Sequence, residues 1–168
     1  MINLDIKIRI ILIDKSKQDF GRDCGGKIYM KNNAFISVKS FNDLETEEVI
    51  EVVTPGEFTI EENGGFKAIY EETEISGMMG TTTTLLIYND ELVLEREGTT
   101  NAKMNFKKGE TSISIYDTPY GMMDLQIKTD ELDVDINENG GKVFAKYSLE
   151  LGGQAPIVTN LSLDVKIN

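Results

Sequence analysis

The sequence predicts an all-β protein that folds as a single antiparallel meander β-barrel of about eight to ten strands. Segments in which apolar and polar residues alternate run almost unbroken from residue 49 to residue 167, with no convincing helix among them. Turn residues separate most of them by about two to five positions, so successive strands should pair as neighbours. Because strands twist, such a long meander is expected to close, which removes both of its edges. The alternative is a two-sheet sandwich, whose Greek-key connections need longer crossovers.

The N-terminal part of the chain predicts one long strand followed by an irregular segment. Apolar side chains occupy alternate positions from Ile2 to Leu12, a pattern typical of a half-buried strand. The alternation weakens between residues 14 and 48, where we expect an irregular loop or hairpin insertion. Within it, Asn32-Asn33 indicates a short hairpin, and Asn42-Asp43 allows one helical turn.

From residue 49 onward, turn residues bound each expected strand. The two clearest hairpin signals are Asn63-Gly64 and Asn139-Gly140, because both residue types tolerate a positive φ. The other boundaries are marked by Pro55-Gly56, Gly77 to Gly80, Asn89-Asp90, Lys108-Gly109 and Pro119 with Gly121. The expected strands are 49–53, 58–61, 66–74, 81–88, 92–97, 102–106, 112–118, 122–129, 132–136, 143–151 and 157–167.

Composition indicates one domain, residues 1–168, in the cytoplasm. The chain is 40% hydrophobic, which is enough for a core, and 27% charged. The net charge of −12 disfavours nucleic acid and anionic membranes as partners, because both need clustered basic residues. The single cysteine, Cys24, excludes an intramolecular disulfide and fits a reducing compartment. The N-terminus also lacks the apolar core of a signal peptide.

The sequence predicts no metal and no cofactor. It contains no histidine, which removes Ser-His-Asp and Cys-His nucleophile systems and the common zinc sites. The segment from Asp135 to Gly140 matches the first half of a calcium-binding loop. Lys146, however, stands at the twelfth position, where a bidentate glutamate is needed. We therefore interpret this segment as an Asn-Gly hairpin.

The candidate site residues are charged side chains at positions that alternation directs inward. Glu72 and Glu74 share a face with Phe66 and Tyr70, and Arg96 shares one with Leu92. Because a buried charge is costly unless it is paired, we expect Arg96 to pair with Glu72 or Glu74. The pair is either structural or an anchor for a polar ligand head, for example a carboxylate held by Arg96. Near the expected rim, Tyr116 and Tyr120 are further candidates for ligand contact or for packing.

Several motifs in order resemble those of the bacterial YwiB-like proteins. They are Tyr70-Glu71-Glu72-Thr73-Glu74, Gly77-Met78-Met79-Gly80 followed by four threonines, Arg96, Thr118-Pro119-Tyr120-Gly121 and Tyr147-Ser148-Leu149. The resemblance covers most of the chain and is strongest from residue 49 to residue 151. It implies a small cytoplasmic barrel with a calycin-like, or lipocalin-like, fold. It implies no activity, because that family has no established one and its fold hosts both carriers and enzymes.

Three functions remain open from the sequence. The first is a non-enzymatic protein, monomer or homodimer, that binds a small, partly apolar ligand inside or at the mouth of the barrel. The second is a cofactor-free lyase or isomerase with Glu72 or Glu74 as base and Arg96 or Tyr116 as electrostatic stabiliser. The third is a protein-interaction barrel whose interior is filled by side chains. An interior cavity of several hundred Å³ separates the first two from the third.

Overall fold

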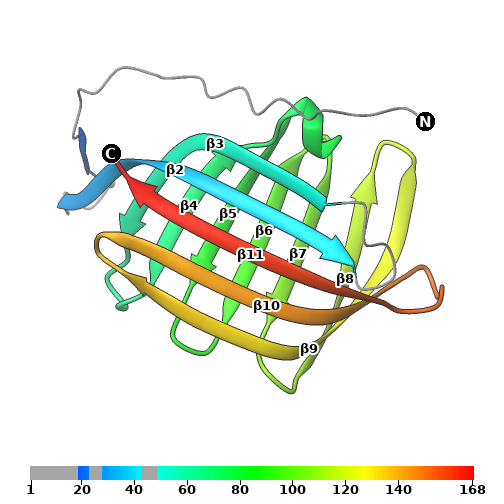
Figure 1. Ribbon diagram of the computed structural model, residues 1–168. Helices are drawn as coiled ribbons and strands as arrows, with labels where there is room; N and C mark the ends of the chain where they lie inside the picture. Colours follow the sequence, from blue (N-terminus) through cyan, green and yellow to red (C-terminus); the bar gives the residue numbers. More distant parts are fainter. Residues whose placement is uncertain (1–18, 23–27, 43–48) are drawn as a thin grey trace, which may run out of the picture.

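The structure is a computed structural model that describes residues 19–22, 28–42 and 49–168 (Figure 1). Each strand from β2 to β10 pairs antiparallel with the next along the chain, and β11 returns to β2. The ring therefore closes with ten strands, while β1 pairs with the start of β2 on the edge that β11 uses further along. The strands are β1 (Asp19–Arg22), β2 (Ile28–Asn42), β3 (Val49–Ile60), β4 (Phe66–Glu71), β5 (Thr81–Ile87), β6 (Leu92–Gly98), β7 (Asn101–Phe106), β8 (Thr111–Thr118), β9 (Gly121–Asn137), β10 (Gly140–Leu151) and β11 (Ile157–Ile167).

This architecture confirms the expected all-β antiparallel meander barrel. In the described part of the chain, the one helical element is η1 (Glu74–Ser76), a single 3-10 turn between β4 and β5. No helix among the described residues is long and apolar enough to cross a membrane. The strand expected over residues 2–12 lies outside the described residues, as do Cys24 and the helical turn expected after Asn42.

Of the irregular loop or hairpin insertion expected over residues 14–48, the described part shows antiparallel pairing of β1 with residues 28–31, but no irregular segment from residue 28 to residue 42. Residues 28–42 form one continuous strand, β2, and Asn32-Asn33 lies within it instead of forming a turn. β2 pairs with β3 on one edge and with β11 on the other, so it is the strand that closes the barrel. The sequence did not predict this strand because many of its residues are polar. Ser37, Lys39 and other outward side chains of β2 are half-buried on the barrel surface.

Two expected turns are also absent, because β3 and β9 are each longer than expected. Pro55-Gly56 lies inside β3, at the point where pairing with β4 ends. Pro55 has no amide hydrogen, and its absence costs little there because Pro55 has no partner in β4. Gly56 points inward, and a Cβ there would lie 2.5 Å from the carbonyl oxygen of Ile69. β9 runs through Asp130, a bulged residue that faces no partner in β10, which keeps one strand where two were expected.

The hydrophobic core fills the end of the barrel at which β3 turns into β4. Phe58 and Phe66 stack there with ring centroids 5.6 Å apart, and Ile87 and Leu92 beside them are fully buried. Across the barrel, alternate residues of β10 face the interior, beginning with the buried Val143 and Ala145. Dense packing at this end leaves the free interior space to the opposite end.

We expect Phe58→Ala to lower the free energy of unfolding by about 3–5 kcal/mol, because it removes a fully buried ring from its stacking partner. The measurement is urea denaturation at equilibrium. The control is Tyr120→Ala, which removes a side chain that is 99% exposed and should change stability by less than about 0.5 kcal/mol. Equal effects of the two substitutions would contradict the assignment of this core.

Candidate functional site

The barrel contains a cavity of about 440 Å³ at the end opposite the stacked phenylalanines. It opens where β3 and β11 begin, since Ile50 and Ile157 line it and are themselves 51% and 43% exposed. Most of its wall is apolar and comes from β6 to β11 as well as from β2 and β3. The deeper wall includes Leu94, Met104, Phe106, Leu125 and Leu161.

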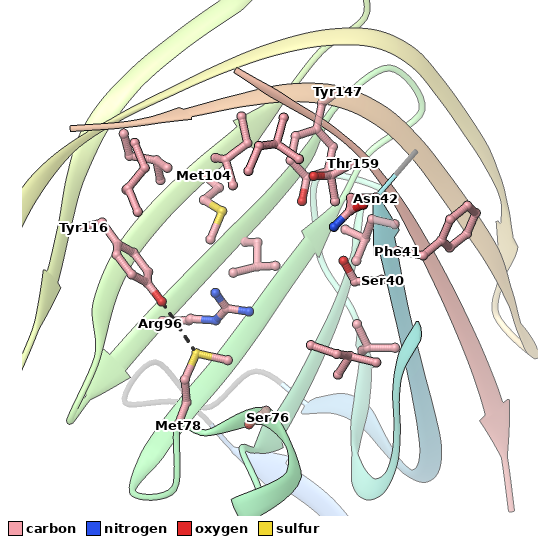
Figure 2. Close-up of a pocket in the computed structure, with 18 of the residues that line it drawn as sticks. Ser40, Phe41, Asn42, Ser76, Met78, Arg96, Met104, Tyr116, Tyr147 and Thr159 are labelled. Atoms are coloured by element: carbon pink, nitrogen blue, oxygen red, sulfur yellow. Dashed lines mark hydrogen bonds between the residues drawn. The ribbon is translucent and has the colours of Figure 1, made fainter. Parts of the chain in front are cut away.

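Arg96 places one guanidinium group inside this apolar cavity (Figure 2). On the neighbouring strands, the residues level with Arg96 are Thr83 in β5 and Ala102 in β7. Both are small, so they leave room for the guanidinium to extend over the inner face of the sheet. The Arg96 side chain is only 16% exposed, which makes it a largely buried cation.

Glu72 is the ion-pair partner of Arg96, and it is itself buried. Its Oε1 lies 3.6 Å from Nε of Arg96 and accepts a hydrogen bond of 2.6 Å from the Thr83 hydroxyl. The backbone amide of Glu72 donates to the Thr81 carbonyl oxygen, which fixes the residue just beyond the end of β4. Glu72 is therefore held by β5 independently of Arg96, and the expected pairing within the barrel is confirmed for Glu72.

The pairing leaves most of the hydrogen-bonding capacity of Arg96 unused. At 3.6 Å the contact with Glu72 is longer than a hydrogen bond, and the buried Nε has no hydrogen-bond partner. Among the described residues, Glu72 is the only group that forms an ion pair with Arg96. No hydrogen bond joins the two Nη atoms of Arg96 to another described residue. The guanidinium therefore presents up to four N–H donors to the cavity.

Two tyrosine hydroxyls belong to the same region as Arg96. Tyr116 lines the cavity from β8 and donates to Sδ of Met78 at 4.0 Å, so its hydroxyl contacts the loop that follows η1 (Figure 2). Tyr147 lines the cavity from β10 and packs edge-on against Phe106. Burial raises the pKa of Tyr147 to about 12, against an opposing effect of the Arg96 charge. Burial, reinforced by the negative charge of Glu72, also raises the pKa of Tyr70 above its ordinary value.

The structure brings together three of the five candidate residues. Glu72, Arg96 and Tyr116 line the cavity. The expectation that Glu74 points inward is wrong, because β4 ends at Glu71 and Glu74 lies exposed on η1. Tyr120 is 99% exposed in the β8–β9 turn and does not line the cavity. A role of these residues in ligand binding stays a prediction.

Sequence reasoning missed several polar cavity residues. Ser40 and Asn42 lie on β2, within the segment that was expected to be irregular, so no face could be assigned to them. Thr159 faces the cavity from β11. Tyr147 is buried on the inner face of β10, and nothing in the sequence indicated that it lies near Arg96. In the described part of the chain, Asp, Glu and Cys side chains form no group of three that could hold a metal ion.

Comparison with known proteins identifies the family. Residues 36–163 match the family described as "Domain of unknown function (DUF1934)". The chain belongs to this family. It is 24% identical over 129 residues to the "Uncharacterized beta-barrel protein YwiB" of Bacillus subtilis (strain 168), an alignment that covers 76% of this chain and 89% of that protein.

A solved structure confirms the fold. The "Crystal structure of ywiB protein from Bacillus subtilis" superimposes with a TM-score of 0.67, covering 82% of this chain and 93% of that one. At 19% sequence identity, this likeness shows the barrel architecture and nothing about activity. The finer assignment to the calycin-like folds stays a prediction.

We expect Thr83→Val to lower the free energy of unfolding by about 1–3 kcal/mol, because it leaves a buried oxygen of Glu72 without its hydroxyl donor at similar side-chain volume. The matched control is Thr82→Val, whose hydroxyl donates at 2.7 Å to the exposed Glu71 and should matter far less. The measurement is urea denaturation of both variants. A larger loss for Thr82→Val would contradict the buried Glu72 arrangement.

Stability should fall at alkaline pH because of Tyr147. A pKa raised from 10.0 to about 12 means that the folded state favours the protonated phenol, so this contribution is complete below pH 10 and lost as pH rises towards 12. The Tyr147 contribution should decline by about 1.4 kcal/mol per pH unit within that window, and buried Tyr70, whose pKa is also raised, adds to the decline of the wild type. Tyr147→Phe should flatten the decline, as measured by denaturation at a series of pH values. An unchanged slope would contradict burial of this hydroxyl.

Proposed function

We propose that the protein is a non-enzymatic binder of a small, partly apolar ligand, which it holds in the barrel cavity. The observation that supports this most directly is an apolar-walled cavity of about 440 Å³ that contains a guanidinium with unused donors. Ligand pockets typically occupy about 300–1,000 Å³ and combine apolar walls with a few placed polar groups. The cavity meets both conditions.

The cost of leaving this space without a ligand supports the same proposal. Empty cavities in protein cores reduce stability roughly in proportion to their volume. At the packed end of the same barrel, buried apolar side chains fill the interior and leave no space for a ligand. Apolar side chains at one end and free volume at the other are therefore best explained by an occupant for the second end.

The two alternative functions have less support in the structure. A filled interaction barrel is disfavoured because the interior is not filled. A lyase or isomerase needs a carboxylate free to accept a proton from a substrate. Among the described residues that line the cavity, Glu72 is the only carboxylate, and Thr83 and Arg96 already engage it. The proposal includes a cytoplasmic location, for which the single cysteine remains the support. It also treats one barrel as the binding unit, whether the protein is a monomer or a homodimer.

The test is binding of 1-aminoanthracene, a small neutral dye that fluoresces in apolar surroundings. Wild-type protein should bind it, and Leu149→Trp should bind it at least about tenfold more weakly, because the larger ring occupies cavity space. Native mass spectrometry of protein from its own host should also show a small molecule that is released on unfolding.

The matched control for the cavity variant is Ile113→Trp, which adds the same ring on the outer face of β8, where the side chain is 72% exposed. It should bind the dye as wild type does. The proposal fails if both tryptophan variants bind the dye equally well, or if the wild-type protein does not bind it at all.

A further inference from the structure

We propose that the ligand is an amphipathic monocarboxylate whose head is held by Arg96 and whose apolar part fills the deeper cavity. This inference rests on the proposed function and adds the chemical class of the ligand. It starts from the orientation of the guanidinium, since Glu72 lies on its Nε side and the Nη atoms have no partner among the described residues. Figure 2 shows these nitrogens directed into the open space of the cavity.

The shape of the free donor group selects a planar anion. Two parallel N–H groups of a guanidinium match the two oxygens of a carboxylate, and such bidentate pairs are among the strongest hydrogen-bonded contacts in proteins. Water cannot compensate the charge in the same way once an apolar ligand has filled the space around it. A ligand with a carboxylate in this position supplies the donors with acceptors that the described residues do not provide.

The charges of the site disfavour a doubly negative head and a cationic head. Arg96 carries one positive charge, and Glu72 already compensates part of it from 3.6 Å away. A dianion such as a phosphate monoester would leave excess negative charge in a largely apolar cavity, which is costly. A cationic head would meet the guanidinium with like charge. A monocarboxylate leaves a smaller excess of negative charge than a dianion and meets no like charge at the guanidinium.

Two further hydroxyls are placed to contact the same head group. Among the residues that the structure describes, the Tyr116 hydroxyl has only the Met78 sulfur, a weak acceptor at 4.0 Å, as its partner. Ser40 faces the cavity from β2, on the other side of Arg96, and its hydroxyl forms no hydrogen bond within the described part of the chain (Figure 2). Both hydroxyls can donate to a carboxylate oxygen without breaking a strong existing bond.

The walls beyond Arg96 define the rest of the ligand. They are formed by Met104, Phe106, Leu125 and Leu161, which offer no charge and little hydrogen bonding. At roughly 30 Å³ for each water-sized group, 440 Å³ holds at most about fifteen non-hydrogen atoms. A medium-length aliphatic acid or a compact aromatic acid fits this limit, and a long-chain lipid does not.

The experiment compares decanoate, decanol and decyl phosphate by isothermal titration calorimetry at about 0.15 M salt, where long-range charge effects are screened. Wild-type protein should bind decanoate at least about tenfold more tightly than decanol. The hydrogen bonds between the charged carboxylate and Arg96 should lower the dissociation constant by about that factor or more. It should bind decyl phosphate more weakly than decanoate. Equal affinity for decanoate and decanol overturns the inference while leaving the proposed cavity function intact.

The decisive variant is the double substitution Arg96→Met with Glu72→Gln. It removes both charges together, so no unpaired carboxylate remains buried, and it keeps an acceptor for the Thr83 hydroxyl. The variant should bind decanol as wild type does and should lose the preference for decanoate.

Lys103→Met is the control for net charge, because Lys103 pairs with Glu95 and is 60% exposed. It should keep the preference for decanoate. Retention of the preference in the double variant, or its loss in Lys103→Met, overturns the assignment of Arg96 as the carboxylate site. Dye binding without binding of decanol or decanoate also overturns it.

Discussion

Closure of the hydrogen-bonded ladder through β2 is the constraint on which the cavity depends. β2 pairs with β3 along one edge and with β11 along the other, so the first and last strands of the ring are hydrogen-bonded to each other. Only this closure gives the sheet an enclosed inner face. In the closed ring, Ser40 on β2 and Arg96 on β6 line one cavity, although they are far apart in the sequence. Without it, the apolar inner face of every strand would be open to water.

Within the closed barrel, neighbouring residues hold Glu72 and Arg96 in place more strongly than the two charged groups hold each other. Buried ion pairs rarely add net stability, because desolvation offsets the attraction between the charges. Here the distance of 3.6 Å gives a weak contact, while Thr83 holds Glu72 with a short hydrogen bond. The small residues Thr83 and Ala102 leave space above the sheet for Arg96. The arrangement favours orientation of a cation over tight neutralisation of its charge.

Alternation in the sequence predicts the barrel, most of the strands and the inward direction of Glu72 and Arg96, because these depend on local pattern alone. It failed where tertiary contacts decide the local structure. Asn32-Asn33 has the composition of a turn but lies in a strand held on both edges by its neighbours. Gly56 looks like a turn residue, yet its lack of a side chain serves close packing against β4. Glu74 was misplaced because the chain leaves the sheet before reaching it.

The bulge in β9 has a consequence for how the family can tolerate insertions and deletions. Before Asp130 the odd-numbered residues Leu125 and Ile127 face the core, and after it the even-numbered residues Leu132 and Val134 pack against it. The extra residue thus moves the inward-facing apolar side chains from odd-numbered to even-numbered positions. A lineage that lost this residue without a compensating insertion nearby would exchange the two faces of the seven residues of β9 that follow it, turning carboxylates such as Asp133 inward. In an alignment of relatives, gaps in β9 should therefore occur in compensated pairs or outside this strand.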